Sequence, residues 1–196
     1  MNYYISDMHF GHKNAIKYDN RPFSSVEEME EEMINRWNST VTDKDMVYVL
    51  GDFSWHKEEK TLELLDRLNG KIVLIRGNHD KISPKIARKL YGKYDYLEVK
   101  DDGVKVVLCH YPMPFWNGQF RDAIHLYGHV HNSNQQNHCL DIRKRLLESQ
   151  GIPMRMINVG SMMDYMDYTP RTLKYILENN KYEYTEGAEK HDNTRI

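Results

Sequence analysis

The chain has 196 residues, of which 40% are hydrophobic and 29% are charged. This length suffices for one domain with a sizeable core and is short for two. The formal net charge of −2 gives no sign of a general nucleic-acid-binding surface, and two cysteines exclude a disulfide framework. Because we find neither a secretory signal nor an apolar run of about 18 residues, we expect a cytoplasmic protein without a membrane span.

Short apolar runs predict five buried strands, and a further run is a sixth candidate. The runs are rich in Val, Ile, Leu and Tyr, and most are continuous rather than alternating, as is typical of strands covered on both faces. In chain order the runs are residues 3–6, 46–50, 71–75, 104–109 and 124–127, followed by 156–159.

Helical patterns separate the first strands. Ser25 and Glu28 form a capping box before residues 26–37, whose apolar side chains recur on one stripe. Leucines between positions 62 and 68 mark a second helix, and Ser83-Pro84 opens a third.

Hairpins replace helices later in the chain, where Asp102-Gly103 predicts a turn between residues 96–99 and 104–109. We therefore expect an α/β fold, with either one mixed sheet or two packed mixed β-sheets flanked by helices. Residues 1–180 would form a single domain, and residues 181–196 a polar, mobile tail. A polar stretch, 132–155, contains a predicted helix at 141–147 whose role stays open.

Side chains of metal-binding types follow each of the five strands. They are Asp7 and His9, Asp52, Asn78, His110, and His129 with His131. Because sites in open α/β sheets form at the carboxyl ends of strands, we expect these side chains to converge. Imidazole with carboxylate suits Zn, Mn, Fe or Ni more than Ca. Seven ligands exceed the needs of one tetrahedral site, so two metals sharing one carboxylate fit better.

The order of these motifs resembles that of the calcineurin-like metallophosphoesterases. It runs Asp-x-His, Gly-Asp, Gly-Asn-His-Asp, a lone His, and Gly-His-x-His, between residues 7 and 131. The segment Ser-Asp-Met-His-Phe-Gly-His at 6–12 and the segment Asn-Arg-Pro-Phe at 20–23 resemble a small single-domain branch from bacteria and phages. The resemblance implies two packed mixed sheets flanked by helices, a metallophosphoesterase-like α/β/β/α sandwich.

The resemblance also implies a role for each residue. Asp7, His9 and His131 would hold the first metal, Asn78, His110 and His129 the second, and Asp52 would bridge both. His79 would lie over the leaving-group oxygen as proton donor or transition-state stabiliser, with Asp80 orienting it by a hydrogen bond. A metal-activated water would be the nucleophile. The cofactors would be two divalent transition-metal ions, with Mn favoured and Fe, Ni or Zn as alternatives.

The predicted function is hydrolysis of phosphate esters, with phosphodiesters favoured because the chain lacks a large cap domain. The substrate could include a nucleotide or nucleic acid, and a nuclease acting on DNA or RNA is one alternative. A non-catalytic, metal-bound scaffold is another, but scaffolds tend to lose ligands or the acid histidine.

Candidate substrate contacts are His12, Arg21 and Arg121. His12 could instead support His9, and the arginines could form surface ion pairs. Natural substrate and oligomeric state stay open.

Overall fold

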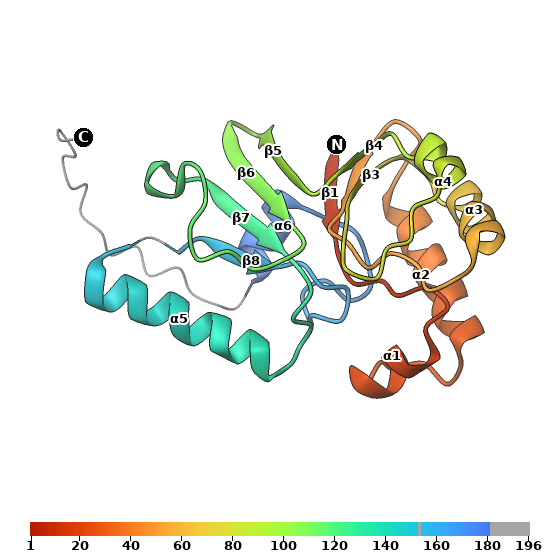
Figure 1. Cartoon of the computed structure of the whole chain (residues 1–196), viewed down its shortest axis with the longest axis horizontal. Helices are drawn as coiled ribbons and strands as arrows, with labels where there is room; N and C mark the ends of the chain where they lie inside the picture. Colours follow the sequence, from red (N-terminus) through yellow and green to blue (C-terminus); the bar gives the residue numbers. More distant parts are fainter. Residues whose placement is uncertain (153, 181–196) are drawn as a thin grey trace.

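The computed structural model describes residues 1–152 and 154–180, and two packed β-sheets form its centre (Figure 1). The first sheet contains, in spatial order, β4 (Gly92–Tyr94), β3 (Lys71–Ile75), β2 (Met46–Val49), β1 (Asn2–Ile5) and β9 (Arg171–Thr172). The second contains β5 (Tyr96–Asp101), β6 (Val104–Cys109), β7 (Ile124–Tyr127) and β8 (Met156–Asn158). Both sheets are mixed, because β9 is antiparallel to β1 and β5 is antiparallel to β6, whereas the other neighbours are parallel.

Helices cover the outer faces of the two sheets (Figure 1). The first sheet carries α2 (Val26–Thr40), α3 (Glu58–Arg67) and α4 (Pro84–Lys89), and the second carries α5 (Asn134–Gln150). The remaining helices are α1 (Lys13–Tyr18), a 3-10 helix (Gln119–Arg121) and α6 (Leu173–Asn179). No helix in the described part of the chain is long and apolar enough to cross a membrane. The predicted two-sheet α/β architecture is confirmed.

Strand β6 shows why the strands have continuous apolar sequences. Successive side chains of a strand point to opposite faces. Val106 and Leu108 lie in the core shared by the two sheets, whereas Val107 lies in a separate cluster with Leu146 of α5 packed against it. Both faces of the strand are therefore buried.

The predicted hairpin is confirmed, because β5 and β6 pair across a turn in which Asp102 and Gly103 have φ angles of 47° and 85°. The helix expected at 141–147 is longer, extending over the whole of α5. Ser133 caps it by accepting a hydrogen bond from the Gln135 N–H at 3.1 Å, and Gly151 ends it with a φ of 63°. The expected tail at 181–196 lies outside the described residues.

The ends of the two sheets meet beside β1 and β8. The Ser6 N–H donates to the Val159 carbonyl at 2.9 Å, and the Asp7 N–H donates to the Gly51 carbonyl at 3.0 Å. The first bond joins the end of β1 to the segment after β8, and the second joins it to the segment after β2. The loops that follow strands of both sheets are thereby brought to one place.

Candidate metal centre

The predicted ligands come together where the two sheets meet. They follow the ends of β1, β2, β3, β6 and β7. In the first group, His131 Nε2 lies 3.1 Å from His9 Nε2 and 3.5 Å from Asp7 Oδ1. The ligand atoms of these three residues lie within 4.8 Å of one another, so they could hold one ion.

The second predicted group lies beside the first, and Asp52 connects the two. Asn78 Oδ1 is 3.1 Å from His110 Nε2 and 3.0 Å from His129 Nδ1. Asp52 Oδ2 is 3.8 Å from His9 Nε2 and 3.7 Å from His110 Nε2. One carboxylate oxygen therefore faces ligand atoms of both groups.

The spacing of these atoms fits coordination of a transition metal. Two nitrogen ligands about 2.1 Å from a tetrahedral ion are about 3.4 Å apart. The ring nitrogens of His9 and His131 are separated by a similar 3.1 Å. The ligand atoms of Asp7, Asp52 and His110 also lie within 4.8 Å of one another, so Asp7 could serve either group. Sequence analysis placed Asp7 in the first group alone.

The backbone at the cluster adopts conformations that few residues other than glycine take. Left-handed φ angles occur at five predicted ligands, namely Asp7 (53°), His9 (52°), Asp52 (51°), His129 (71°) and His131 (49°). Such conformations cost energy and concentrate at functional sites. The loops also approach closely: a Cβ on Gly77 would collide with Asp52 Oδ1, and one on Gly128 with Ser6 Oγ. Glycine at these two positions lets the loops pack against the side chains of Asp52 and Ser6.

Hydrogen bonds orient two of the histidines. His110 Nδ1 lies 2.7 Å from the Leu50 carbonyl, and His131 Nδ1 lies 2.7 Å from Asp19 Oδ1. Both acceptors require that Nδ1 carry the proton. Nε2 is then the nitrogen that faces the cluster in each ring, which is the usual arrangement of a metal-binding histidine.

Burial and neighbouring charges shift the pKa values inside the cluster. Burial raises the pKa of Asp7, but the hydrogen bond and positive charge of His131 outweigh it and lower that pKa to about 2. Burial lowers the pKa of His9 to about 3, although the charge of Asp7 opposes the shift. Burial also disfavours charge on His131, but hydrogen bonds to Asp19 and Asp7 raise its pKa to about 10. A metal binding to His131 would have to displace its proton.

The side chains of His79 and Asp80 have different surroundings. The His79 side chain is exposed, and its ring centroid lies 6.0 Å from that of His9. The Asp80 carboxylate accepts hydrogen bonds from the backbone N–H groups of Asp52, Phe53 and Gly77 at 2.8–2.9 Å. Within the described residues Asp80 makes no hydrogen bond to the His79 ring, so the expectation that it orients His79 is corrected. Asp80 instead holds the loop that carries Asp52.

The three candidate substrate contacts are placed differently. His12 lies beside the cluster, with its ring centroid 5.4 Å from that of His9. Arg21 is buried, and its guanidinium is bonded to protein groups. Arg121 is exposed and lies just before the start of β7, whereas the ligands follow the end of that strand. The structure therefore does not bring Arg121 to the cluster.

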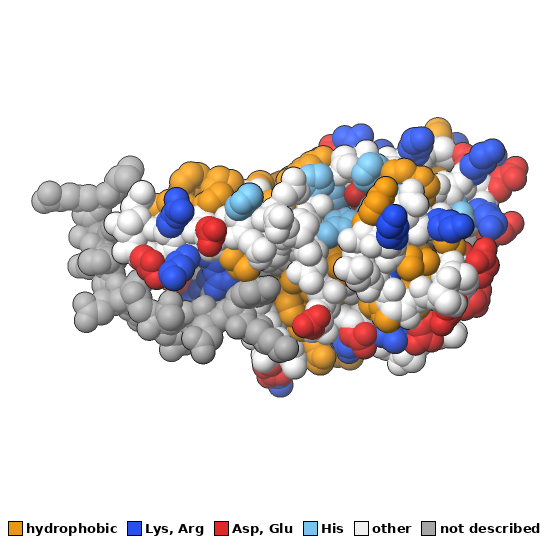
Figure 2. Space-filling view, turned by 90° about the horizontal axis from the view of Figure 1, so that it is seen from below, with side chains coloured by type: hydrophobic (Ala, Val, Ile, Leu, Met, Phe, Trp, Pro, Cys, Tyr) orange, Lys and Arg blue, Asp and Glu red, His pale blue; other side chains and the backbone are white. Residues whose placement is uncertain are grey.

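Sequence analysis missed two exposed aromatic side chains that flank the cluster. Trp55, 46% exposed, has its ring centroid 4.6 Å from that of His79 and stacks on His12 at 4.2 Å. Tyr111, 44% exposed, has its ring centroid 4.7 Å from that of His129. Figure 2 shows histidine side chains at the surface near the middle of one face, with hydrophobic side chains beside them. The positions of Trp55, three residues after Asp52, and of Tyr111, directly after His110, could have suggested both.

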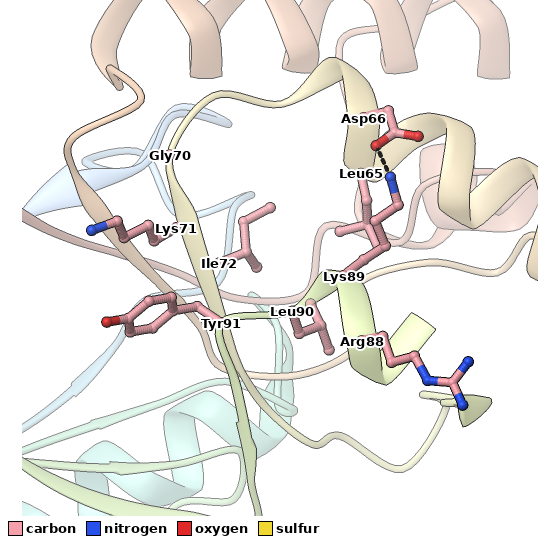
Figure 3. A pocket seen from close by; sticks show the side chains of 9 residues that line it. All are labelled: Leu65, Asp66, Gly70, Lys71, Ile72, Arg88, Lys89, Leu90 and Tyr91. Carbon is pink, nitrogen blue, oxygen red and sulfur yellow. Dashed lines mark hydrogen bonds and ion pairs between the residues drawn. The ribbon is translucent and has the colours of Figure 1, made fainter. Parts of the chain in front are cut away.

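A cavity of about 340 Å³ lies elsewhere, beside the start of β3 (Figure 3). Its lining includes Gly70, Lys71 and Tyr91, and an ion pair between Lys89 and Asp66. The predicted ligands follow the other end of β3. The length of the strand separates the cavity from the cluster, and we assign the cavity no part in the chemistry.

His125 lies fully buried beneath the loop that follows His110. Its Nδ1 is 3.1 Å from the Val107 carbonyl, and its Nε2 accepts a hydrogen bond from the Met113 N–H at 3.1 Å. Burial lowers the pKa of His125 to about 4, although hydrogen bonds to backbone carbonyls oppose the shift. The neutral ring therefore anchors the Tyr111–Met113 turn beside the cluster.

We expect His125 to make the fold sensitive to mild acid. The unfolded chain takes up this proton near pH 6.5, whereas the folded chain takes it up only near pH 4, so stability falls as pH drops through this interval. The full loss corresponds to about 3 kcal/mol. Urea unfolding between pH 7 and 4, in chelator, should show a shallower pH dependence for His125→Asn than for the wild type. The exposed-site variant His138→Asn should retain the wild-type slope; an unchanged slope in His125→Asn would contradict the assignment.

Comparison with known proteins identifies the family. A profile described as "Calcineurin-like phosphoesterase superfamily domain" matches residues 3–180. The chain therefore belongs to the calcineurin-like phosphoesterase superfamily. The predicted enzyme class, a metal-dependent phosphoesterase, is confirmed at the level of the family.

Three individual proteins are similar to this chain over most of its length. "Uncharacterized protein MJ1445" of Methanocaldococcus jannaschii is 39% identical over 178 residues, which cover 90% of this chain and 89% of the relative. "Gene 66 protein" of Mycobacterium phage D29 is 27% identical over 186 residues, covering 81% and 86%. A solved structure, the protein of unknown function AQ665 from Aquifex aeolicus, has a TM-score of 0.69 and 26% identity, covering 91% of this chain and 98% of that chain. The phage relative fits the predicted bacterial and phage branch.

Proposed function

We propose that the protein hydrolyses phosphodiesters at a centre of two divalent transition metals. The position of Asp52 Oδ2, 3.8 Å from His9 Nε2 and 3.7 Å from His110 Nε2, carries the proposal. In it, Asp52 would bridge the ions, while Asp7, His9 and His131 would hold one and Asn78, His110 and His129 the other. Bound metals would supply an activated water and neutralise charge on the phosphate. Mn is the proposed metal, with Fe, Ni and Zn as alternatives, since imidazole and oxygen donors without thiolate suit all four.

The residues around the ions have separate tasks in this proposal. His79 is exposed at the cluster, and its backbone N–H donates to Asp52 Oδ1 at 2.9 Å, which fixes the residue beside the bridge. Its ring can donate a proton to the leaving-group oxygen. A non-catalytic scaffold is disfavoured because all seven ligands and His79 are present in one cluster.

The preference for diesters is supported by the two flanking aromatic side chains. A diester carries two organic groups, one on each side of the phosphate, whereas a monoester carries one. Trp55 lies beside His79 and His9 of the first ligand group, and Tyr111 lies beside His129 of the second. Each exposed ring can pack against one ester group, and planar groups such as nucleobases would stack best.

Metal removal and a substrate panel test this function. The chelated protein should lose hydrolysis of bis(p-nitrophenyl) phosphate, and Mn should restore it more fully than Mg. With Mn, the diester should have a higher kcat/KM than p-nitrophenyl phosphate. Single-stranded DNA and RNA belong in the same panel, because their cleavage would identify the nuclease alternative. Full activity in chelator, with no metal detected by elemental analysis, would overturn the proposal.

A further inference from the structure

We infer that Asp19 and Arg21 are positioning residues for the first ligand group. Asp19 holds the His131 ring, and Arg21 holds the loop that carries Asp7 and His9. The inference builds on the proposed metal centre. It concerns an ion pair whose carboxylate lies at Nδ1 of His131, the ring nitrogen other than the Nε2 that faces His9. Neither residue contacts the reacting atoms in this assignment.

The contact between Asp19 and His131 fixes the ring of the ligand. Asp19 Oδ1 accepts a hydrogen bond from His131 Nδ1 at 2.7 Å, and the Asp19 side chain is 5% exposed. The bond keeps the proton on Nδ1 and leaves Nε2 directed at His9 Nε2, 3.1 Å away. A carboxylate in this position also makes the imidazole a stronger ligand.

Arg21 connects Asp19 to the opposite half of the group. Its Nε and Nη2 donate to Asp19 Oδ2 at 2.9 and 2.8 Å, as a two-pronged ion pair. Its Nη2 also donates to the Asp7 carbonyl at 2.9 Å, and its Nη1 donates to the Met8 carbonyl at 2.8 Å. These carbonyls belong to the segment in which Asp7 and His9 have left-handed φ angles of 53° and 52°. The pair thus holds a strained loop against the ligand that faces it.

All the hydrogen-bonding capacity of Arg21 is used in this way. A guanidinium has five N–H donors. Four are accounted for by Asp19 and the two carbonyls, and Nη1 also points at Met29 Sδ, 3.7 Å away. The Arg21 side chain is 0% exposed. The role that these contacts favour is to position ligands, in place of the phosphate contact or surface ion pair that the sequence offered as alternatives.

Binding of Mn²⁺, measured without turnover, tests the inference. Isothermal titration calorimetry and elemental analysis should find two sites in the wild type. In Asp19→Asn, one site should weaken by about 10–100-fold, as is typical when the carboxylate partner of a metal-binding histidine is lost, while the other site keeps its affinity. Asp122→Asn is the matched control, because Asp122 is exposed and pairs with Arg155 at the far end of β7. It should bind both ions as the wild type does.

A second variant covers the case in which Asp19→Asn does not fold. Arg21→Lys keeps the positive charge next to Asp19 but cannot also reach the Asp7 and Met8 carbonyls, so it should weaken the same site. Wild-type binding of both ions by either folded variant would overturn the inference, as would equal weakening of both sites. A wild type that binds two ions yet hydrolyses no ester would instead refute the proposed function and leave this inference standing.

Discussion

Asp52→Asn is expected to lower the kcat/KM of phosphodiester hydrolysis about 1000-fold and to lower metal content at both positions. Asp52 Oδ2 faces His9 Nε2 and His110 Nε2 at nearly equal distances. The Oδ1 of an asparagine could still bind one ion, but it carries no negative charge to share between two cations. The bridge is therefore lost, and with it the charge that offsets the repulsion between the ions. Losing about 4 kcal/mol of transition-state stabilisation would lower kcat/KM about 1000-fold.

Two further variants distinguish loss of a bridging carboxylate from loss of a ligand of one ion and from a change of surface charge. His9→Ala removes a ligand from one group and should lower metal content toward one ion per chain. Asp122→Asn changes an exposed carboxylate far from the cluster and should change neither metal content nor activity. Elemental analysis and kcat/KM for bis(p-nitrophenyl) phosphate measure the two effects. Normal metal content and turnover in Asp52→Asn would show that Asp52 does not bridge the ions.

The ligand cluster could be predicted from sequence because each member follows a recognisable strand. Asp52 comes directly after Gly51 at the end of an apolar run, and His110 directly after β6. The carboxyl ends of parallel strands share an edge, so local pattern was enough to bring distant residues together. The continuous apolar runs predicted strands covered on both faces, but they left one mixed sheet or two packed sheets open. The resemblance to the family favoured two.

The hydrogen-bond partners of the residues in and around the cluster could not be predicted. They lie on loops far apart in the sequence, and loops show no repeating pattern from which their packing could be inferred. Asp80 was expected at His79, but its carboxylate faces three backbone N–H groups of neighbouring loops. Arg21 was a candidate phosphate ligand, since sequence alone does not reveal that its side chain is buried. Asp19 carries no motif of its own, and its contact with His131 spans 112 positions.

Helix α5 illustrates a second limit. Sequence analysis placed a helix at 141–147, less than half of the helix at Asn134–Gln150. Its buried residues include Gln136 and Arg143. Because these residues are polar, the spacing of hydrophobic residues does not reveal the whole buried face of the helix. Gln136 accepts hydrogen bonds from Tyr127 Oη and Asn158 Nδ2 at 3.0 Å, and Asn158 also donates to the His131 carbonyl at 3.0 Å. Polar packing of this helix therefore supports the segment that carries a predicted ligand.

His79→Ala should lower kcat for a dialkyl phosphate by about 10²–10⁴-fold, the usual contribution of general acid–base catalysis. Both metals should stay bound. The exposed ring lies at the cluster but outside both predicted ligand groups. The hydrogen bond to the Asp52 carboxylate comes from the His79 backbone N–H, which alanine retains. Elemental analysis should therefore find the wild-type metal content, and the exposed-site variant His138→Ala should keep full activity.

The dependence of the loss on the leaving group distinguishes a proton donor from other roles of His79. An alkoxide needs a proton as it departs, whereas p-nitrophenolate is stable without one, so a proton donor matters far more for alkyl esters. We expect His79→Ala to reduce kcat for methyl p-nitrophenyl phosphate, which releases p-nitrophenolate, much less than for a dialkyl phosphate. Equal losses on the two substrates would mean that His79 stabilises charge or positions the phosphate instead. Loss of a metal in the variant would make His79 a ligand, and Asn78, its neighbour in the same turn, would then need reassignment.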